Sequence, residues 1–236
     1  MMQNKSTIQE IKERFDNDVE RFSNLDTGQV STIDAKLSLE IITEAANRIV
    51  PRATHLLDIG SGAGNYTLTM LSKNPSLNCT LVDLSKPMLD KADERISAVT
   101  NKVTTLQRDI REVELKDNYF DIILAGAVLH HLREDEDWEA TFKKLYTILK
   151  PGGCLMISDL VSQDNEILTQ YISENYGDYL TKIGGEEYKQ KVLDYIQKED
   201  SPRSITYQLK LMEKIGFRYA EVLHKNSCFG AFCGIK

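Results

Sequence analysis

The stretch LLDIGSGAGNYT, residues 56–67, decides the fold. An apolar run that contains one acid, Asp58, ends in three glycines at alternate positions, Gly60, Gly62 and Gly64. Glycine adopts positive φ readily, and it lacks the Cβ that would collide with a close ligand. The stretch therefore predicts a strand that ends in a tight loop, with a ligand bound close to the backbone.

From residue 54 onward, apolar segments of strand length alternate with segments long enough for crossover helices. This alternation predicts a parallel sheet with helices on both faces. Two later apolar segments, residues 217–224 and 228–235, have so short a connection that only antiparallel pairing fits, and we expect them to form a hairpin at the sheet edge. The parallel strands are expected at residues 54–59, 79–84, 103–108, 120–125 and 154–160.

Asp83 closes the second expected strand, 23 residues after Gly60. An acid at that position can accept two hydrogen bonds from the diol of a ribose, so the loop and the acid together predict an adenosine site. The dinucleotide-binding pattern G-x-G-x-x-G needs its last glycine one residue later, where this chain has Asn65. A nicotinamide-dependent oxidoreductase is therefore the last of the alternatives.

The composition, with 41% hydrophobic and 28% charged residues, is that of an ordinary globular protein. The formal net charge of −7 argues against a nucleic-acid partner, because an acidic protein repels phosphate backbones. The first residues contain no apolar segment of a signal peptide, and no stretch approaches the length of a membrane span. We therefore expect a cytoplasmic protein without a membrane partner. The oligomeric state stays open, with a homodimer among the options.

Five motifs in order resemble those of the class I S-adenosylmethionine-dependent methyltransferases. LLDIGSGAG is similar to the family's first motif, LVDLSKPML to the acid that ends its second strand, and LQRDIREV to the end of its third strand. FDIILAGAVLHHL and LYTILKPGGCLMISD resemble its fourth strand and the passage into its fifth. The resemblance covers residues 54–159 and returns in the terminal hairpin. It implies an α/β fold: a doubly wound, Rossmann-like, seven-stranded, mostly parallel sheet with a terminal antiparallel strand and a helical cap.

With this fold in view, the chain divides into a core and appendages. Residues 1–50 are expected to form an N-terminal helical cap, in which an apolar stripe from Ile8 to Phe22 predicts an amphipathic helix. Residues 51–160 are expected to form the cofactor-binding core, and residues 161–203 a helical substrate insert. Residues 204–236 would add a helix and the hairpin that complete the core.

The resemblance implies S-adenosyl-L-methionine as the cofactor and S-adenosyl-L-homocysteine as its product. The acid after the second strand would hold the ribose hydroxyls, and Asp58 would orient the glycine loop and contact the ammonium group. The residues after the second and third strands would surround the adenine, and those after the fourth would offer backbone groups to the ammonium. The expected cofactor-binding residues are Asp58, Gly60, Gly62, Asp83, Leu84, Met88, Asp109, Ile110, Ala125 and Gly126.

A sulfonium methyl group is already activated, so the protein mainly has to position the acceptor and exclude water. A base is needed mainly when the acceptor arrives protonated. His130, His131 and Asp159 are the candidates for this catalytic role. The alternative is that one histidine packs or caps the next segment while the other faces solvent. No second and third ligand accompany Asp159 in the sequence, so we expect no metal site.

The insert is rich in tyrosine, a side chain with an apolar face and a hydroxyl group. Two roles are open: the tyrosines line a substrate cavity, or they hold the insert on the sheet. They are Tyr171, Tyr176, Tyr179, Tyr188 and Tyr195.

Both ends of the chain also resemble the carboxy-S-adenosylmethionine synthases, which serve the modification of wobble uridine in tRNA. Those enzymes grip the extra carboxylate of their cofactor with an arginine. In this chain Leu211 stands at that place, with Lys210 beside it. The departure favours ordinary methyl transfer.

We therefore expect a methyltransferase that acts on a small-molecule substrate. The alternatives are an enzyme of the carboxy-S-adenosylmethionine synthase type, another tRNA or protein methyltransferase, and a non-catalytic regulatory module that binds the cofactor. A local basic surface would point to a macromolecular acceptor.

Overall fold

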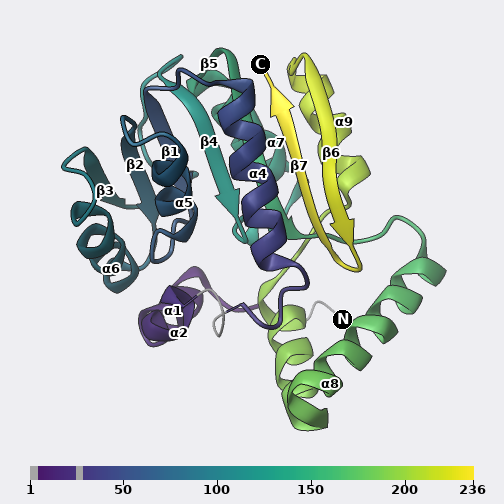
Figure 1. Cartoon of the computed structure of the whole chain (residues 1–236). Coiled ribbons are helices and arrows are strands. Elements are labelled where there is room, and N and C mark those ends of the chain that lie inside the picture. Colours follow the sequence, from purple (N-terminus) through teal and green to yellow (C-terminus); the bar gives the residue numbers. More distant parts are fainter. Residues whose placement is uncertain (1–4, 25–28) are drawn as a thin grey trace.

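The computed structural model describes residues 5–24 and 29–236, which contain one mixed sheet with helices on both faces (Figure 1). Residues 1–4 and 25–28, which belong to the expected cap, lie outside the described residues. The strand order is β3-β2-β1-β4-β5-β7-β6. The strands are β1 (His55–Ile59), β2 (Asn78–Asp83), β3 (Val103–Gln107), β4 (Phe120–Gly126), β5 (Leu149–Leu160), β6 (Tyr219–Asn226) and β7 (Phe229–Ile235).

The pairing confirms the doubly wound sheet with a terminal hairpin. Strands β1 to β5 pair in parallel, whereas β7 pairs antiparallel with both β5 and β6. At the end of β1, Ile59 pairs with Val82 on one side and with Ala125 on the other. This register brings the carboxyl ends of β1, β2 and β4 together at one edge, the edge where such folds bind ligands.

The helices form two layers and an appendage. Helices α4, α5 and α6 cover one face of the sheet, and α7 and α9 cover the other (Figure 1). The short helices α1 and α2 and the long α8 lie beyond the carboxyl edge (Figure 1). The helices are α1 (Ile8–Asp16), α2 (Val19–Ser23), α4 (Ala35–Ile49), α5 (Asn65–Lys73), α6 (Lys86–Ser97), the 3-10 turn η1 (Leu129–His131), α7 (Asp135–Ile148), α8 (Glu166–Glu199) and α9 (Ile205–Ile215).

The core follows from the apolar runs of the central strands. Ile122, Ile123 and Leu124 of β4 are all completely buried. Because successive side chains of a strand point to opposite faces, Ile123 joins the apolar cluster under α7 and α9, whereas its two neighbours join the cluster under α4 to α6. A strand that is buried on both faces reads as a continuous apolar run, as this one does.

The N-terminal segment differs from the single amphipathic helix expected from its apolar stripe. The structure breaks it into α1 and α2 at Asn17 and Asp18. The Asn17 side chain donates to the carbonyl oxygen of Glu13 at 2.7 Å, a local bond of the kind by which asparagine competes with helix continuation. Of the stripe, Ile11 is buried, while Ile8 is 46% exposed.

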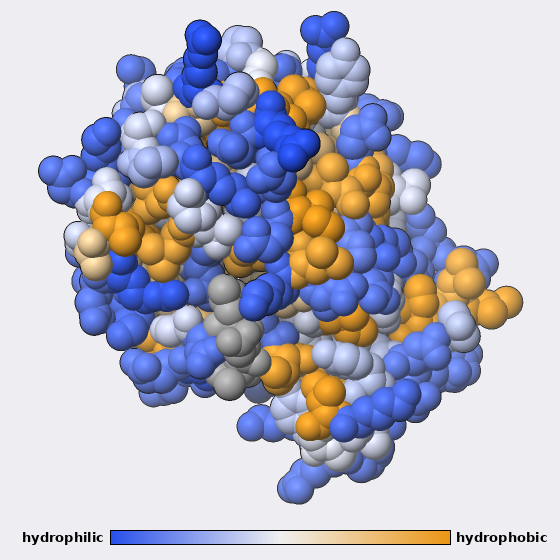
Figure 2. All heavy atoms as spheres, viewed as in Figure 1, coloured by the Kyte–Doolittle hydropathy of each residue, from blue (hydrophilic) through white to orange (hydrophobic). Residues whose placement is uncertain are grey.

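Residues 166–199 of the expected insert form α8, and two tyrosines hold this helix in place. The Tyr176 hydroxyl donates to the carbonyl oxygen of Ser31 at 2.9 Å, and that of Tyr179 to the carbonyl oxygen of Val30 at 2.7 Å. Both tyrosines thereby attach α8 to the segment that precedes α4. The outer end of α8 is apolar and solvent-exposed, as Figure 2 shows, with Ile167 77% exposed. Among the described residues, no helix has both the length and the apolar character that a membrane crossing requires.

Truncation of a core aromatic residue should lower the stability of this fold. Phe142 of α7 is completely buried, and its ring centroid lies 5.9 Å from that of Trp138. We expect Phe142→Ala to reduce the free energy of unfolding by about 3–5 kcal/mol, because it leaves a cavity under the sheet. Urea denaturation measures this value. Val99→Ala, at a residue that is 63% exposed, is the control and should change it by less than about 0.5 kcal/mol.

Candidate functional site

The glycine loop between β1 and α5 has the geometry that its sequence predicts. Gly60 and Gly62 have φ of 61° and 50°, in the left-handed region that favours glycine. A Cβ on Gly60 would lie 2.5 Å from Val128 Cγ2, whereas a Cβ on Gly62 would meet no atom within 4 Å. At Gly62 the backbone therefore faces free space at the carboxyl edge, where a ligand can approach it.

Asp83 connects this loop to the end of β2. One oxygen of its carboxylate accepts from the backbone N–H of Gly62 at 2.8 Å, and the other accepts from that of Ser85 at 2.8 Å. Burial raises the pKa of Asp83, and the negative charge of Asp16 adds to that effect, while the backbone donors oppose it. Each carboxylate oxygen accepts more than one hydrogen bond, so the group can still accept from a ribose diol.

Asp58 and Ser61 supply two further buried polar groups. The Thr67 hydroxyl donates to Asp58 at 2.7 Å, and burial raises the pKa of Asp58 to about 7. The hydroxyl of Ser61 is buried and has no hydrogen-bond partner within the described part of the chain. A carboxylate without a cation and a hydroxyl without a partner, both beside the glycine loop, fit a ligand with positive charge and hydrogen-bonding groups.

The other expected cofactor residues lie at the same edge. Ala125 and Gly126 end β4, and a Cβ on Gly126 would lie 2.5 Å from the Tyr66 ring. Leu84 and Met88 follow β2, and Met88 is almost fully buried. Asp109 and Ile110 follow β3.

Asp109 is paired within the chain. Its carboxylate is held by the Arg111 guanidinium at 2.6 Å, and hydrogen bonds from Arg111 help to lower its pKa against the effect of burial. An adenine amine would have to share this carboxylate with Arg111.

Asp159 organises a second polar centre at the end of β5. Its carboxylate accepts from the backbone N–H groups of Leu129, His130 and Leu160 at 2.8, 3.2 and 2.8 Å. It also bonds to Nδ1 of the His130 ring. Asp159 therefore fixes both the turn η1 and the orientation of the His130 imidazole.

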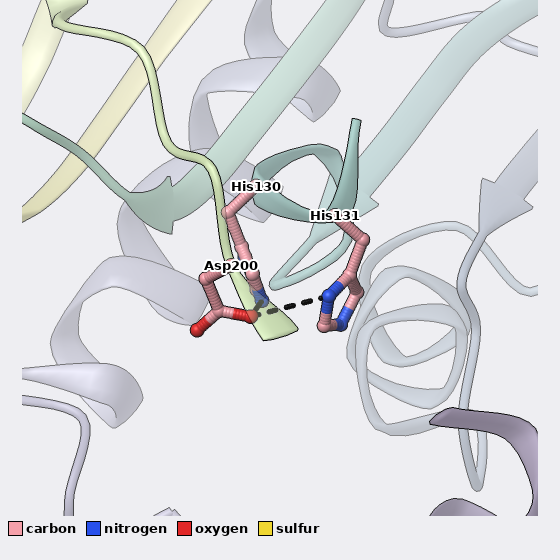
Figure 3. A group of neighbouring side chains, drawn as sticks. All are labelled: His130, His131 and Asp200. Atoms are coloured by element: carbon pink, nitrogen blue, oxygen red, sulfur yellow. Dashed lines mark ion pairs between the residues drawn. The ribbon is translucent and has the colours of Figure 1, made fainter. Parts of the chain in front are cut away.

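Asp200, which the sequence analysis missed, completes this centre from the end of α8. Figure 3 shows its carboxylate and the two imidazole rings pointing toward one another. Asp200 Oδ1 lies 3.6 Å from His130 Nε2 and 3.2 Å from His131 Nδ1. The backbone N–H of Ser201 donates to the His130 carbonyl oxygen at 2.7 Å and holds the two segments in this position. No local pattern marks Asp200, because only the return of α8 to the sheet gives it these neighbours.

The two histidines differ in charge. Burial alone would lower the pKa of His130, but Asp159 and Asp200 outweigh it and raise that pKa to about 9. Burial and the neighbouring His130 lower the pKa of His131. Among the described residues, no group forms a hydrogen bond of good geometry with either ring nitrogen of His131 or with Asp200 Oδ1. Neither histidine is the solvent-facing residue that the alternative interpretation required, since both are largely buried.

Helices α1 and α2 cover this edge, and we call them the lid. The Phe15 ring lies edge-on to the His131 ring, with 6.0 Å between centroids. Asn65 at the start of α5 donates to the Phe22 carbonyl oxygen at 3.1 Å. Arg14 forms a two-pronged pair with Glu199 at the end of α8, at 2.8–3.0 Å. The lid therefore contacts both the glycine loop and the centre around Asp200.

Comparison with known proteins agrees with this arrangement. A family model described as a methyltransferase domain matches residues 56–153, the part that contains the glycine loop and the first four strands. This match and the relatives below support a class I S-adenosylmethionine-dependent methyltransferase. Its cofactor is therefore S-adenosylmethionine, as the sequence analysis expected. When bound, that cofactor supplies a methyl group on a sulfonium, and the free space at Gly62 and the unpaired polar groups beside it fit such a ligand.

Two curated relatives and one solved structure show the range of similar proteins. A carboxy-S-adenosyl-L-methionine synthase of Vibrio atlanticus is 28% identical over 199 residues, 81% of this methyltransferase and 80% of the relative. A demethylmenaquinone methyltransferase of Listeria welshimeri is 26% identical over 193 residues, 79% and 80% of the two chains.

The solved structure shares the fold. The 1,6-didemethyltoxoflavin-N1-methyltransferase of Burkholderia thailandensis, with 1,6-didemethyltoxoflavin and S-adenosylhomocysteine bound, has a TM-score of 0.65 at 16% identity. The match covers 100% of this methyltransferase and 93% of that chain.

Replacement of Asp159 should destabilise this methyltransferase. Asp159→Asn exchanges one acceptor oxygen for a donor, although all the groups around the carboxylate are themselves donors. We expect a loss of about 3 kcal/mol in the free energy of unfolding, measured by urea denaturation. The control, Asp164→Asn at an exposed aspartate, should be neutral. A loss of less than about 1 kcal/mol would contradict the organising role of Asp159.

Proposed function

We propose that this methyltransferase transfers the methyl group of S-adenosylmethionine to a small-molecule acceptor beneath the lid. The covering of the His131 ring by Phe15 of the lid and by Asp200 carries the proposal. Asp200 lies on one side of this ring and Phe15 on another, and the His131 side chain is only 17% exposed. An acceptor there would be surrounded by the chain itself, which suits a small molecule better than a folded protein or RNA.

The residues beside the glycine loop would hold the cofactor. Asp83 would accept hydrogen bonds from the ribose, and Asp58 would face the ammonium group. Gly60 and Gly62 would let the backbone approach, and the rest of the expected set, Leu84, Met88, Asp109, Ile110, Ala125 and Gly126, would surround the adenine and the amino-acid part. Their positions at the ends of β1 to β4 support these roles.

On the acceptor side the chain would act mainly by positioning. In-line methyl transfer needs the acceptor atom, the methyl carbon and the sulfur in a row, and fixed orientation can contribute about 7–11 kcal/mol. Asp159 would serve as a positioning residue, because it fixes η1 and the His130 ring. His130 and His131 would present their remaining ring nitrogens to the acceptor side, next to Asp200. The lid would exclude water.

Carboxy-S-adenosylmethionine synthesis is the second candidate, because relatives that cover about four fifths of both chains carry that name. The arginine that grips the extra carboxylate has no counterpart here. Leu211 is 6% exposed and belongs to the apolar cluster under α7 and α9, while Lys210 points to solvent. Native mass spectrometry of protein purified from its cells separates the two, because carboxy-S-adenosylmethionine is heavier than S-adenosylmethionine by the added carboxyl group.

Four free cysteines, three of them buried, are compatible with a reducing compartment, and we include a cytoplasmic location in the proposal.

Replacement of Asp83 should weaken cofactor binding. Asp83→Ala removes the proposed acceptor of two ribose hydroxyls, and each charged hydrogen bond contributes about 1.5–3 kcal/mol. We expect S-adenosylhomocysteine to bind at least about 10–100-fold more weakly by isothermal titration calorimetry. Asp90→Ala, at an exposed aspartate of α6 paired with Lys86, is the matched control and should bind normally. Equal affinities of the two variants would argue against the proposed ribose contact.

Cofactor binding should also release protons through Asp58. The pKa of this carboxyl is raised to about 7, so in the free protein it is largely protonated below about pH 6. A cationic ligand favours the ionised carboxylate. Binding of S-adenosylmethionine should therefore release up to about one proton near neutral pH and strengthen as the pH rises from about 5 to about 8.

Calorimetry in buffers of different ionisation enthalpy measures this release. Asp58→Asn should abolish it. Release that persists in a folded Asp58→Asn protein would assign the proton to another group.

A further inference from the structure

The residues around Asp200 form a set that neither the fold nor cofactor binding explains. Two imidazole rings and one carboxylate meet at the acceptor side of the site (Figure 3). One ring nitrogen or carboxylate oxygen from each of His130, His131 and Asp200 can be chosen so that all three atoms lie within 4.8 Å of one another. Imidazole nitrogen and carboxylate oxygen are the donors that zinc and ferrous iron take in proteins.

We propose that His130, His131 and Asp200 bind one divalent transition-metal cation. A tetrahedral or octahedral metal with bonds of about 2.1 Å separates its ligand atoms by about 3.0–3.4 Å. Asp200 Oδ1 lies 3.2 Å from His131 Nδ1 and 3.6 Å from His130 Nε2. Two of the three distances between ligand atoms are thus close to those of a metal site, without any movement of the side chains.

The unsatisfied atoms of the set support a ligand at this place. Asp200 is 4% exposed, yet its Oδ1 has no hydrogen-bond partner among the described residues. Both ring nitrogens of His131 are also buried without a hydrogen bond in that part of the chain, although Nδ1 lies within ion-pair distance of Asp200 Oδ1. A buried polar atom without a partner costs about 1–3 kcal/mol. A cation between these atoms would satisfy Asp200 and one nitrogen of His131 together.

The surroundings have the outer arrangement that metal sites use. A histidine that binds a metal usually donates its other ring N–H to a carboxylate, which fixes the ring. His130 has this arrangement, because Asp159 holds Nδ1 while Nε2 faces Asp200. The hydrogen bond from Ser201 N–H to the His130 carbonyl oxygen holds the neighbouring Asp200 close to the two histidines.

The nearby charges are compatible with a cation. Asp159 and Asp200 bring two buried negative charges to two imidazole rings, and without a metal a proton on His130 balances one of them. A divalent ion would displace this proton and balance both charges. The neighbouring cations bond to groups other than the Asp200 carboxylate: Arg14 pairs with Glu199, and the Lys5 ammonium donates to the backbone oxygens of Gln197 and Asp200.

Three protein ligands leave at least one coordination position open. The open position would face the space beneath Phe15, where the acceptor is proposed to lie. The metal would then bind an oxygen or nitrogen atom of the acceptor and hold it for methyl transfer. This use of the metal rests on the proposed function, whereas metal binding itself does not.

Titration with Co²⁺ tests the proposal on the full chain after treatment with a chelator. We expect one Co²⁺ per chain, with visible absorption bands that disappear when Zn²⁺ displaces it, because Zn²⁺ has no such bands. Asp200→Asn and His131→Gln should each weaken Co²⁺ binding by at least about tenfold. His55→Gln is the matched control, because His55 lies at the start of β1, at the opposite edge of the sheet, and should bind as the unchanged chain does.

A second measurement needs no variant and covers the case in which one fails to fold. The chain has four histidines. In nitrogen NMR spectra of the labelled chain, Zn²⁺ should shift the ring signals of His130 and His131 and leave those of His55 and His224 unchanged.

Absence of Co²⁺ and Zn²⁺ binding, or binding that survives both substitutions, would overturn the metal site. In that case a proton on His130, between Asp159 and Asp200, would supply the positive charge of the centre. Cofactor affinity is measured separately on the same samples. Failure of the methyl-transfer proposal would appear there, without changing the metal result.

Discussion

The carboxyl ends of parallel strands meet at one edge of the sheet, and this constraint places the three strand carboxylates of the candidate site. Asp58 and Asp159 lie buried in β1 and β5, and Asp83 lies partly buried at the end of β2. A buried carboxylate is costly unless donors surround it. The chain supplies these donors from the loops that follow the strands. The same hydrogen bonds that stabilise the acids therefore give the loops their shape.

This arrangement produces two neighbouring centres with different properties. Around Asp83 and the glycine loop, the carboxylates face space that the backbone leaves free. Around Asp159, the carboxylate is fully used within the chain, and it is the histidines and Asp200 that keep unused atoms. The first centre suits a ligand that comes and goes. The second is more rigid, since one carboxylate fixes the turn and one backbone bond fixes the end of α8.

The sequence was sufficient for the features that depend on local rules. Glycines at alternate positions, an acid at the end of the second strand and two close apolar segments predicted the loop, Asp83 and the terminal hairpin. The comparisons confirmed the family and the cofactor. The break between α1 and α2 was missed, because the apolar residues keep their helical spacing across Asn17 and Asp18, although the helix stops there.

The neighbours of the appendages could not be predicted, because they depend on how distant segments return to the sheet. Asp200 is 70 residues from His130 in the chain, and no spacing rule connects them. The sequence left two roles open for the tyrosines of α8. Tyr176 and Tyr179 attach the helix, because their hydroxyls donate to the carbonyl oxygens of residues 31 and 30. Their partners are backbone atoms, which no sequence pattern reveals.

Gly185 divides α8 into two arms that can change independently in evolution. Gly185 has φ of 80° and ψ of 179°, so the two arms of the helix are not one continuous rod. The first arm begins with exposed apolar residues, which Figure 2 shows, and the second arm leads to Asp200. Mutations at the exposed start of the outer arm, at Ile167 and Leu168, can change the surface there, while Tyr176 and Tyr179 keep the arm attached. Evolution thus has a segment that it can vary at little cost to the chemistry.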